Sequence, residues 1–147
     1  MTALLALLAL LAPAPSPSLT PQAVVKLQVE ALKTNDAPKP DAGIAQVWAF
    51  ASPANKQQTG PLERFAQMVH DPMYAPMLNH RRVQFGPIKV IGDEARQVVI
   101  LEPARGPAVG YLFILGRQPP GGPHAGCWMT DAVIRMPDEA APKTITI

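Results

Sequence analysis

Acid–base chemistry is the first possibility that the residue types raise, because few ionisable side chains lie among apolar neighbours. Asp131 lies in the segment from Trp128 to Arg135, and we expect Met129 and Val133 on its own face of a strand. A carboxylate among apolar neighbours has a raised pKa and can act as a general base. Tyr74 is the candidate partner, because its hydroxyl can donate to a ligand carbonyl.

Each of these two candidates also has a structural interpretation. Asp131 can point to solvent, or pair across the sheet with Arg82 or Arg135. A tyrosine at the position of Tyr74 commonly packs its ring and leaves its hydroxyl in water. Both interpretations stay open from the sequence, so no residue is assigned as catalytic.

The remaining reactive side chains favour structural roles. Asp41 precedes an apolar stripe and is typical of a helix cap. Cys127 is the only cysteine, which excludes an internal disulfide, and it fits a small buried residue better than a nucleophile. His70 and His80 are ten residues apart, which matches no standard metal-ligand spacing. With no phosphate-binding or nucleotide-binding motif either, we expect no metal and no cofactor.

The composition bounds the class of protein. The chain has 147 residues, which fits one domain, and only 16% of them are charged. Its 18 prolines exclude long uninterrupted helices and coiled coils. The net charge is +2 and the longest basic cluster is Arg81-Arg82, so we expect no nucleic-acid partner.

The N-terminus resembles an export signal. The run from Ala3 to Ala12 is apolar but too short to span a bilayer, which takes about 20 residues. Residues 12–14 form an Ala-x-Ala-like cleavage site. We therefore expect a signal peptide over 1–14, a proline-rich linker over 15–20, export to the periplasm or the medium, and no stable membrane span.

Apolar spacing predicts helices in the first half of the chain. One helix is expected over about 21–34 and a second over 42–51, followed by a polar loop over 54–59. Gly60-Pro61-Leu62-Glu63 opens a third helix, since proline suits its first position.

The second half alternates with the period of strands. We expect strands over 83–90, 94–101, 109–116 and 128–135, the first of them bulged at Gly86-Pro87. Helices followed by strands indicate an α+β domain over 21–136, with three N-terminal helices packed on a curved, bulged, four-stranded antiparallel sheet. Residues 137–147 are expected to be a polar tail.

Several short motifs resemble an uncharacterised family of bacteria and plants, catalogued as a domain of unknown function. They extend over residues 22–136 and include Asp41-x-Gly43-Ile44, Phe50-Ala51-Ser52-Pro53-x-Asn55, Thr59-Gly60-Pro61-x-x-Arg64-Phe65, Tyr111-x-Phe113-x-Leu115 and Cys127-Trp128-Met129-Thr130. That family is similar to the nuclear-transport-factor-2-like (cystatin-like) superfamily. The resemblance implies a cone-shaped fold with an interior cavity and, by analogy, a homodimer formed by sheet packing. It implies no activity.

Two sets of residues are candidates for a site within such a cone. The polar residues of the Thr-Gly-Pro motif region are expected to hold its loop first and to contact a ligand second: Asn55, Thr59 and Arg64. Four aromatic residues form the core or line the cavity, and periodicity does not separate these roles: Trp48, Phe65, Phe113 and Trp128.

The sequence therefore favours an exported, non-catalytic module that binds a small apolar ligand or associates with itself through its sheet. The alternative is a small lyase or isomerase that uses Asp131 and Tyr74 in the cavity. The two hypotheses differ in where the Asp131 carboxylate points.

Overall fold

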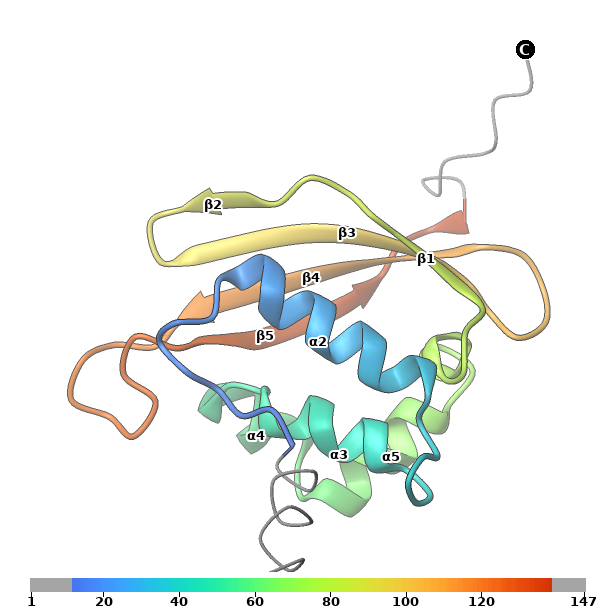
Figure 1. Cartoon of the computed structure of the whole chain (residues 1–147), viewed down its shortest axis with the longest axis horizontal. Helices are drawn as coiled ribbons and strands as arrows, with labels where there is room; N and C mark the ends of the chain where they lie inside the picture. The colour runs from blue at the N-terminus through green and yellow to red at the C-terminus, as the bar shows by residue number, and fades with distance from the viewer. Residues whose placement is uncertain (1–11, 139–147) are drawn as a thin grey trace, which may run out of the picture.

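The computed structural model describes residues 12–138 of the chain (Figure 1). In that part, four α-helices and one 3-10 turn precede five strands. They are α2 (Pro21–Lys33), α3 (Ala42–Ala49), α4 (Pro53–Thr59), α5 (Leu62–His70), η1 (Ala75–Met77), β1 (Arg82–Phe85), β2 (Lys89–Ile91), β3 (Glu94–Glu102), β4 (Val109–Arg117) and β5 (Trp128–Arg135).

The strands form one antiparallel sheet. Its order is β1-β3-β4-β5, and β2 pairs with β3 beyond the end of β1. The α+β class and the antiparallel pairing are thereby confirmed. The sheet is neither closed nor strongly curled, so the strong curvature of the expected cone is not observed.

The predicted bulge at Gly86-Pro87 is present and divides the first predicted strand into β1 and β2. Phe85 lies opposite Val99, whereas Lys89 lies opposite Arg96, so one extra residue is accommodated between the two strands. The Gly86 carbonyl accepts a hydrogen bond from the side chain of Gln97 at 2.8 Å. The sheet therefore has five strands where four were expected.

The polar loop predicted over 54–59 is wrong, because these residues form α4. Ser52 accepts a hydrogen bond from the amide of Asn55 at 3.2 Å, and Pro53 occupies the first helical turn. Serine followed by proline therefore begins a helix here. The helix predicted over 42–51 accordingly ends at Ala49, and α4 follows after three residues.

Asp41 does not cap α3 with its side chain. Its φ is 59°, in the left-handed region, and no backbone amide of the helix donates to its carboxylate. The cap comes from the end of α2 instead, because the buried Asn35 accepts from the amide of Ile44 at 2.9 Å. The Asn35 amide group also donates to Asp41 at 3.0 Å, which ties the two helix ends together.

The helices lie against one face of the sheet, and the core lies between the two layers (Figure 1). α2 lies along the sheet and buries Val24, Val25 and Val29 completely. The opposite face of the sheet carries half-buried or exposed apolar side chains and is here called the outer face: Val98, Ile100, Leu112, Ile114 and Ile134. No described element covers them.

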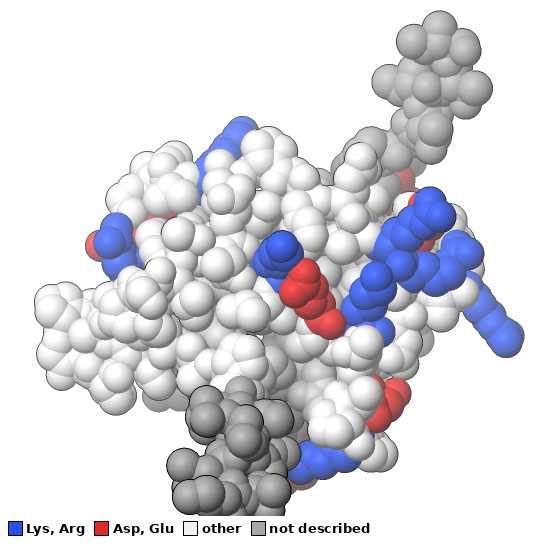
Figure 2. Space-filling model, viewed as in Figure 1, with Lys and Arg blue, Asp and Glu red and all other residues white. Residues whose placement is uncertain are grey.

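Charges are sparse on the surface seen in Figure 2. Lysine and arginine gather at the end where β1 begins and the β3–β4 loop lies, with acidic side chains among them. Arg81 and Glu102 form an ion pair there, with 3.8 Å between the guanidinium and the carboxylate. Among residues 12–138, no helix has the length and apolar character that crossing a membrane requires.

The predicted signal peptide lies mostly outside the described residues, as does the tail from 139 onward. The segment before α2 packs on the domain, since Leu19 contacts the core and Gln46 donates to the carbonyl of Pro13. Thr20 then caps α2 by accepting from the amide of Ala23 at 3.1 Å.

Candidate functional site

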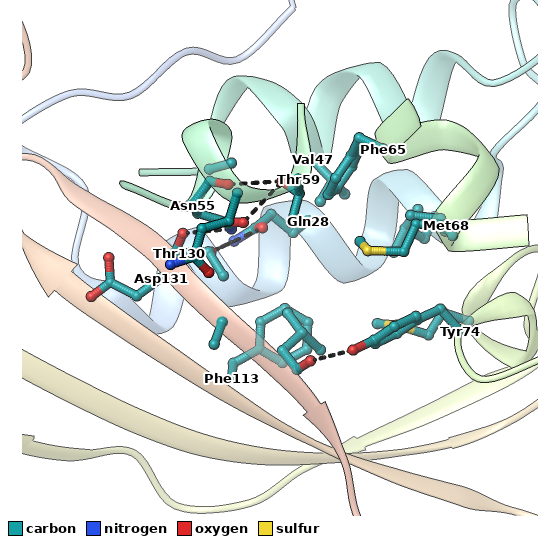
Figure 3. Close-up of a pocket in the computed structure, with 17 residues that line it drawn as sticks. Gln28, Val47, Asn55, Thr59, Phe65, Met68, Tyr74, Phe113, Thr130 and Asp131 are labelled. Carbon is teal, nitrogen blue, oxygen red and sulfur yellow. Dashed lines mark hydrogen bonds between the residues drawn. The ribbon is translucent and has the colours of Figure 1, made fainter. Parts of the chain in front are cut away.

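A cavity of about 180 Å³ lies between the helices and the strands β4 and β5 (Figure 3). It is smaller than the roughly 300–1,000 Å³ of sites for drug-sized ligands, and close to the roughly 150 Å³ that holds one benzene ring. Most of its lining is apolar and includes Leu32, Val47, Phe65, Met68, Val69, Met77, Phe113 and Val133.

One end of the cavity carries a cluster of uncharged polar side chains, here called the polar cluster: Gln28, Asn55, Thr59 and Thr130 (Figure 3). The Gln28 amide donates to the Thr130 hydroxyl at 2.8 Å and to the carbonyl of Val24 at 3.1 Å. The Thr130 hydroxyl donates in turn to Oε1 of Gln28 at 3.0 Å. Both side chains are buried, and these bonds satisfy them internally.

The backbone of Thr130 joins the helical layer to the sheet. Its carbonyl accepts from the amide of Ser52 at 2.9 Å and from the side chain of Asn55 at 3.0 Å. Its amide donates to the carbonyl of Phe50 at 2.8 Å. A single parallel bridge between Ala51 and Thr130 results, and it covers the edge of β5 beside the pocket.

Tyr74 lies at the other end of the cavity (Figure 3). Its hydroxyl donates to the carbonyl of Val133 at 3.0 Å, so its hydrogen is already used within the protein. The ring stacks on Tyr111, with 6.2 Å between centroids. Burial raises the pKa of Tyr111 to about 12, and its hydroxyl donates to the carbonyl of Met73 at 2.8 Å.

Asp131 borders the cavity, but its carboxylate points away from it (Figure 3). A bulge explains this: Ile114 pairs with Ala132 and Leu115 with Thr130, which leaves Asp131 as the extra residue. The exposed carboxylate lies against Gly116, where an added Cβ would meet its Oδ2 at 2.6 Å.

Strict alternation predicts Asp131 and Val133 on the same face of the strand. The bulge places them on different faces. The structure does not bring the Asp131 carboxylate and the Tyr74 hydroxyl together across the pocket.

The four candidate aromatic residues divide into two pairs. Phe65 and Phe113 line the cavity. Trp48 is not among the lining residues; its ring packs against that of Phe65 with 5.1 Å between centroids, and Nζ of Lys56 lies over it. Trp128 is buried in the core at the start of β5, beneath the guanidinium of Arg117.

The loop motif contributes two of its three candidate residues to the pocket. The hydroxyl of Thr59 donates to the carbonyl of Asn55 at 2.9 Å, and its oxygen also lies 3.1 Å from Asn55 Oδ1. Arg64 is exposed on α5 and makes no side-chain hydrogen bond to the described residues. The carboxylate of Asp41 lies 2.9 Å from Nε2 of His70.

Within residues 12–138, the remaining reactive side chains form no second centre. Among the described residues, no group of three or more His, Cys, Asp or Glu side chains is placed to hold a metal ion. Cys127 is buried at the start of β5. His80 is buried below η1, with Nδ1 at 2.8 Å from the carbonyl of Met77, and burial lowers its pKa.

Sequence reasoning missed Gln28 and Thr130 as pocket residues. The signal for Gln28 was a polar side chain on the apolar stripe of the first helix. For Thr130 no local signal existed, because its partners are 102 and about 80 residues away and only folding brings them together.

Fold and site together define a class: an α+β domain with a small, largely apolar pocket between its two layers. The family model described as "Domain of unknown function (DUF4864)" matches residues 17–141. The chain belongs to that family, which confirms the family-level resemblance. No curated protein and no solved structure matches the chain.

Proposed function

We propose that this domain is a non-catalytic binding module whose pocket takes one small, largely apolar molecule. The observation that carries the proposal is the cavity of about 180 Å³, whose lining is mainly apolar and into which no ionised side chain points. An apolar pocket with a few uncharged polar groups binds by burying ligand surface, at roughly 25 cal/mol per Å².

A titration with toluene, followed by NMR shifts of the methyl groups around the pocket, tests this proposal. Val47→Phe fills the cavity and should abolish the shifts, because Val47 lines it. Val90→Phe is the matched control, since Val90 is 49% exposed on β2, away from the pocket. Native mass spectrometry of the purified chain would reveal a natural ligand. The proposal fails if toluene leaves the pocket methyl groups unmoved and no small molecule co-purifies.

The enzymatic alternative, a lyase or isomerase, needs a base inside the pocket. Asp131 would have to turn from the outer side of the bulge, and Tyr74 would have to release the Val133 carbonyl. Nothing in the lining supplies another base. The binding function is therefore the better-supported proposal.

Self-association through the outer face is a second proposal. Its five apolar side chains lie next to one another across β3, β4 and β5. Both ends of the face carry acidic and basic side chains: Glu94, Asp131 and Arg96 at one end, and Glu102 with Arg82 at the other. A second copy related by a two-fold axis can place opposite charges against each other while it covers the apolar centre.

Light scattering after size exclusion tests this second proposal. The wild-type chain should elute as a dimer, and Ile134→Lys should elute as a monomer, because Ile134 is 49% exposed on that face. Met73→Lys is the matched control, since Met73 is 53% exposed but lies outside the sheet. A wild-type monomer at high concentration would contradict the proposal.

We also propose export, with cleavage near Ala14, and membership of the nuclear-transport-factor-2-like superfamily. The apolar run of residues 3–12 supports export, and N-terminal sequencing of the protein from fractionated cells tests it. The order of helices before an antiparallel sheet supports the superfamily. A crystal structure in which the sheet stays flat would count against it.

A further inference from the structure

Four polar side chains of the pocket already use their donor hydrogens within the protein. Tyr74 donates to Val133, Thr59 donates to Asn55, and Thr130 donates to Gln28. Gln28 has two amide hydrogens, and both have acceptors, the carbonyl of Val24 and the hydroxyl of Thr130. These four side chains therefore have no donor left for a ligand.

The same groups retain acceptor capacity. A hydroxyl oxygen can accept as well as donate, and no described residue donates to the hydroxyl oxygen of Thr59 or of Tyr74. One of these oxygens lies in the polar cluster and the other at the opposite end of the cavity (Figure 3). The remaining amide N–H groups belong to the half-buried Asn55 and the exposed Gln58.

The charge of the lining limits the ligand further. Apart from Asp131, whose carboxylate points away, no residue that lines the pocket carries a charge. A carboxylate ligand would lose its hydration and meet no cation inside, and its donors would be limited to the amide groups of Asn55 and Gln58. A ligand whose only polar group is a carbonyl would find the hydroxyl hydrogens of Thr59 and Tyr74 already bonded, and could accept only from the amide groups of Asn55 and Gln58.

We infer that the pocket selects a small neutral molecule, about one aromatic ring in size, that carries an O–H or N–H donor. This inference rests on the proposed binding function and adds the polarity of the ligand. The donor bonds to the hydroxyl oxygen of Thr59 in the polar cluster, and the ring lies between Phe65, Phe113 and the aliphatic lining.

Four one-ring probes separate the possibilities by NMR titration of the full chain. Phenol carries a donor, benzaldehyde only an acceptor, benzoate a charge, and toluene none of these. Phenol should bind three- to tenfold more tightly than benzaldehyde, in keeping with one neutral hydrogen bond of about 1 kcal/mol. Benzoate should not bind.

Thr59→Val removes the acceptor with little change of shape, so it should weaken phenol three- to tenfold and leave toluene within twofold. If this variant is unstable, Tyr74→Phe tests the other oxygen by the same comparison. Benzaldehyde or benzoate binding as tightly as phenol, with toluene still bound, would overturn the donor selectivity but not the binding function. If none of the probes binds and no small molecule co-purifies, the binding function itself fails.

Discussion

Thr130 is the residue on which the two layers depend most. Its amide, carbonyl and hydroxyl all have partners on the helical side, and only 2% of its surface is exposed. A buried polar group that loses its partner costs more than a hydrogen bond contributes, because the group is left without water as well.

Thr130→Val should therefore lower the free energy of unfolding by about 2 kcal/mol, since it leaves Oε1 of Gln28 without its donor. Urea unfolding measures this change. The double variant Gln28→Leu/Thr130→Val should lose less than the two single losses combined, because it removes both members of the pair. Additive losses would show that the pair is not coupled.

His80 should make the stability depend on pH. Burial is the main cause of its lowered pKa, and the charge of Lys33 acts in the same direction, against the bond to Met77. As the pH falls through about 6.5, the unfolded chain takes up a proton that the folded chain refuses, so the free energy of unfolding decreases.

Urea unfolding at pH 7.5 and pH 5 checks this prediction. His80→Leu should flatten the dependence between these values, because it removes the buried imidazole. If the free energy of unfolding of His80→Leu still depended on pH as steeply as that of the wild type, another group would be responsible.

At the scale of elements, the contact between α2 and α3 depends on a glycine. A Cβ on Gly43 would lie 2.8 Å from Oδ1 of Asn35 and closer still to the carbonyl oxygen of Ala31. The same Asn35 oxygen caps α3. Close packing and capping therefore both require a small residue at this position.

Gly43→Ala should lower the free energy of unfolding by about 1–3 kcal/mol, the usual cost of overpacking. Ala45→Ser, at an exposed position of the same helix, is the control and should change it by less than about 0.5 kcal/mol. If Gly43→Ala instead raised the midpoint of thermal unfolding, helix propensity, which favours alanine over glycine, would outweigh packing.

At the scale of the whole molecule, the segment before α2 belongs to the folded unit. A chain that begins at Pro15 keeps Leu19 on the core and Thr20 at the helix cap, whereas one that begins at Pro21 loses both. The shorter chain should be less stable by about 2 kcal/mol, from one cap and part of one leucine side chain. Equal unfolding midpoints of the two chains in urea would contradict this.

Local pattern predicted most of the elements, because helix and strand periods are properties of neighbouring residues. The strands, the bulge at Gly86-Pro87 and the first helix follow from spacing and turn residues. α4 was missed because it is polar all round and buries no side chain completely, so it has no apolar stripe. The single residue inserted at Asp131 was also missed, since it follows only from pairing with β4.

The sequence alone determined the class of fold, the family, and the small number of ionisable groups that a pocket here can use. Only the tertiary structure decided which groups face the pocket. Strand alternation is broken by an insertion that neighbouring strands define, and so Asp131 lies outside while Thr130 and Val133 lie inside. The direction of each hydroxyl hydrogen likewise depends on partners far away in the chain, because a donor turns toward whichever acceptor folding brings near.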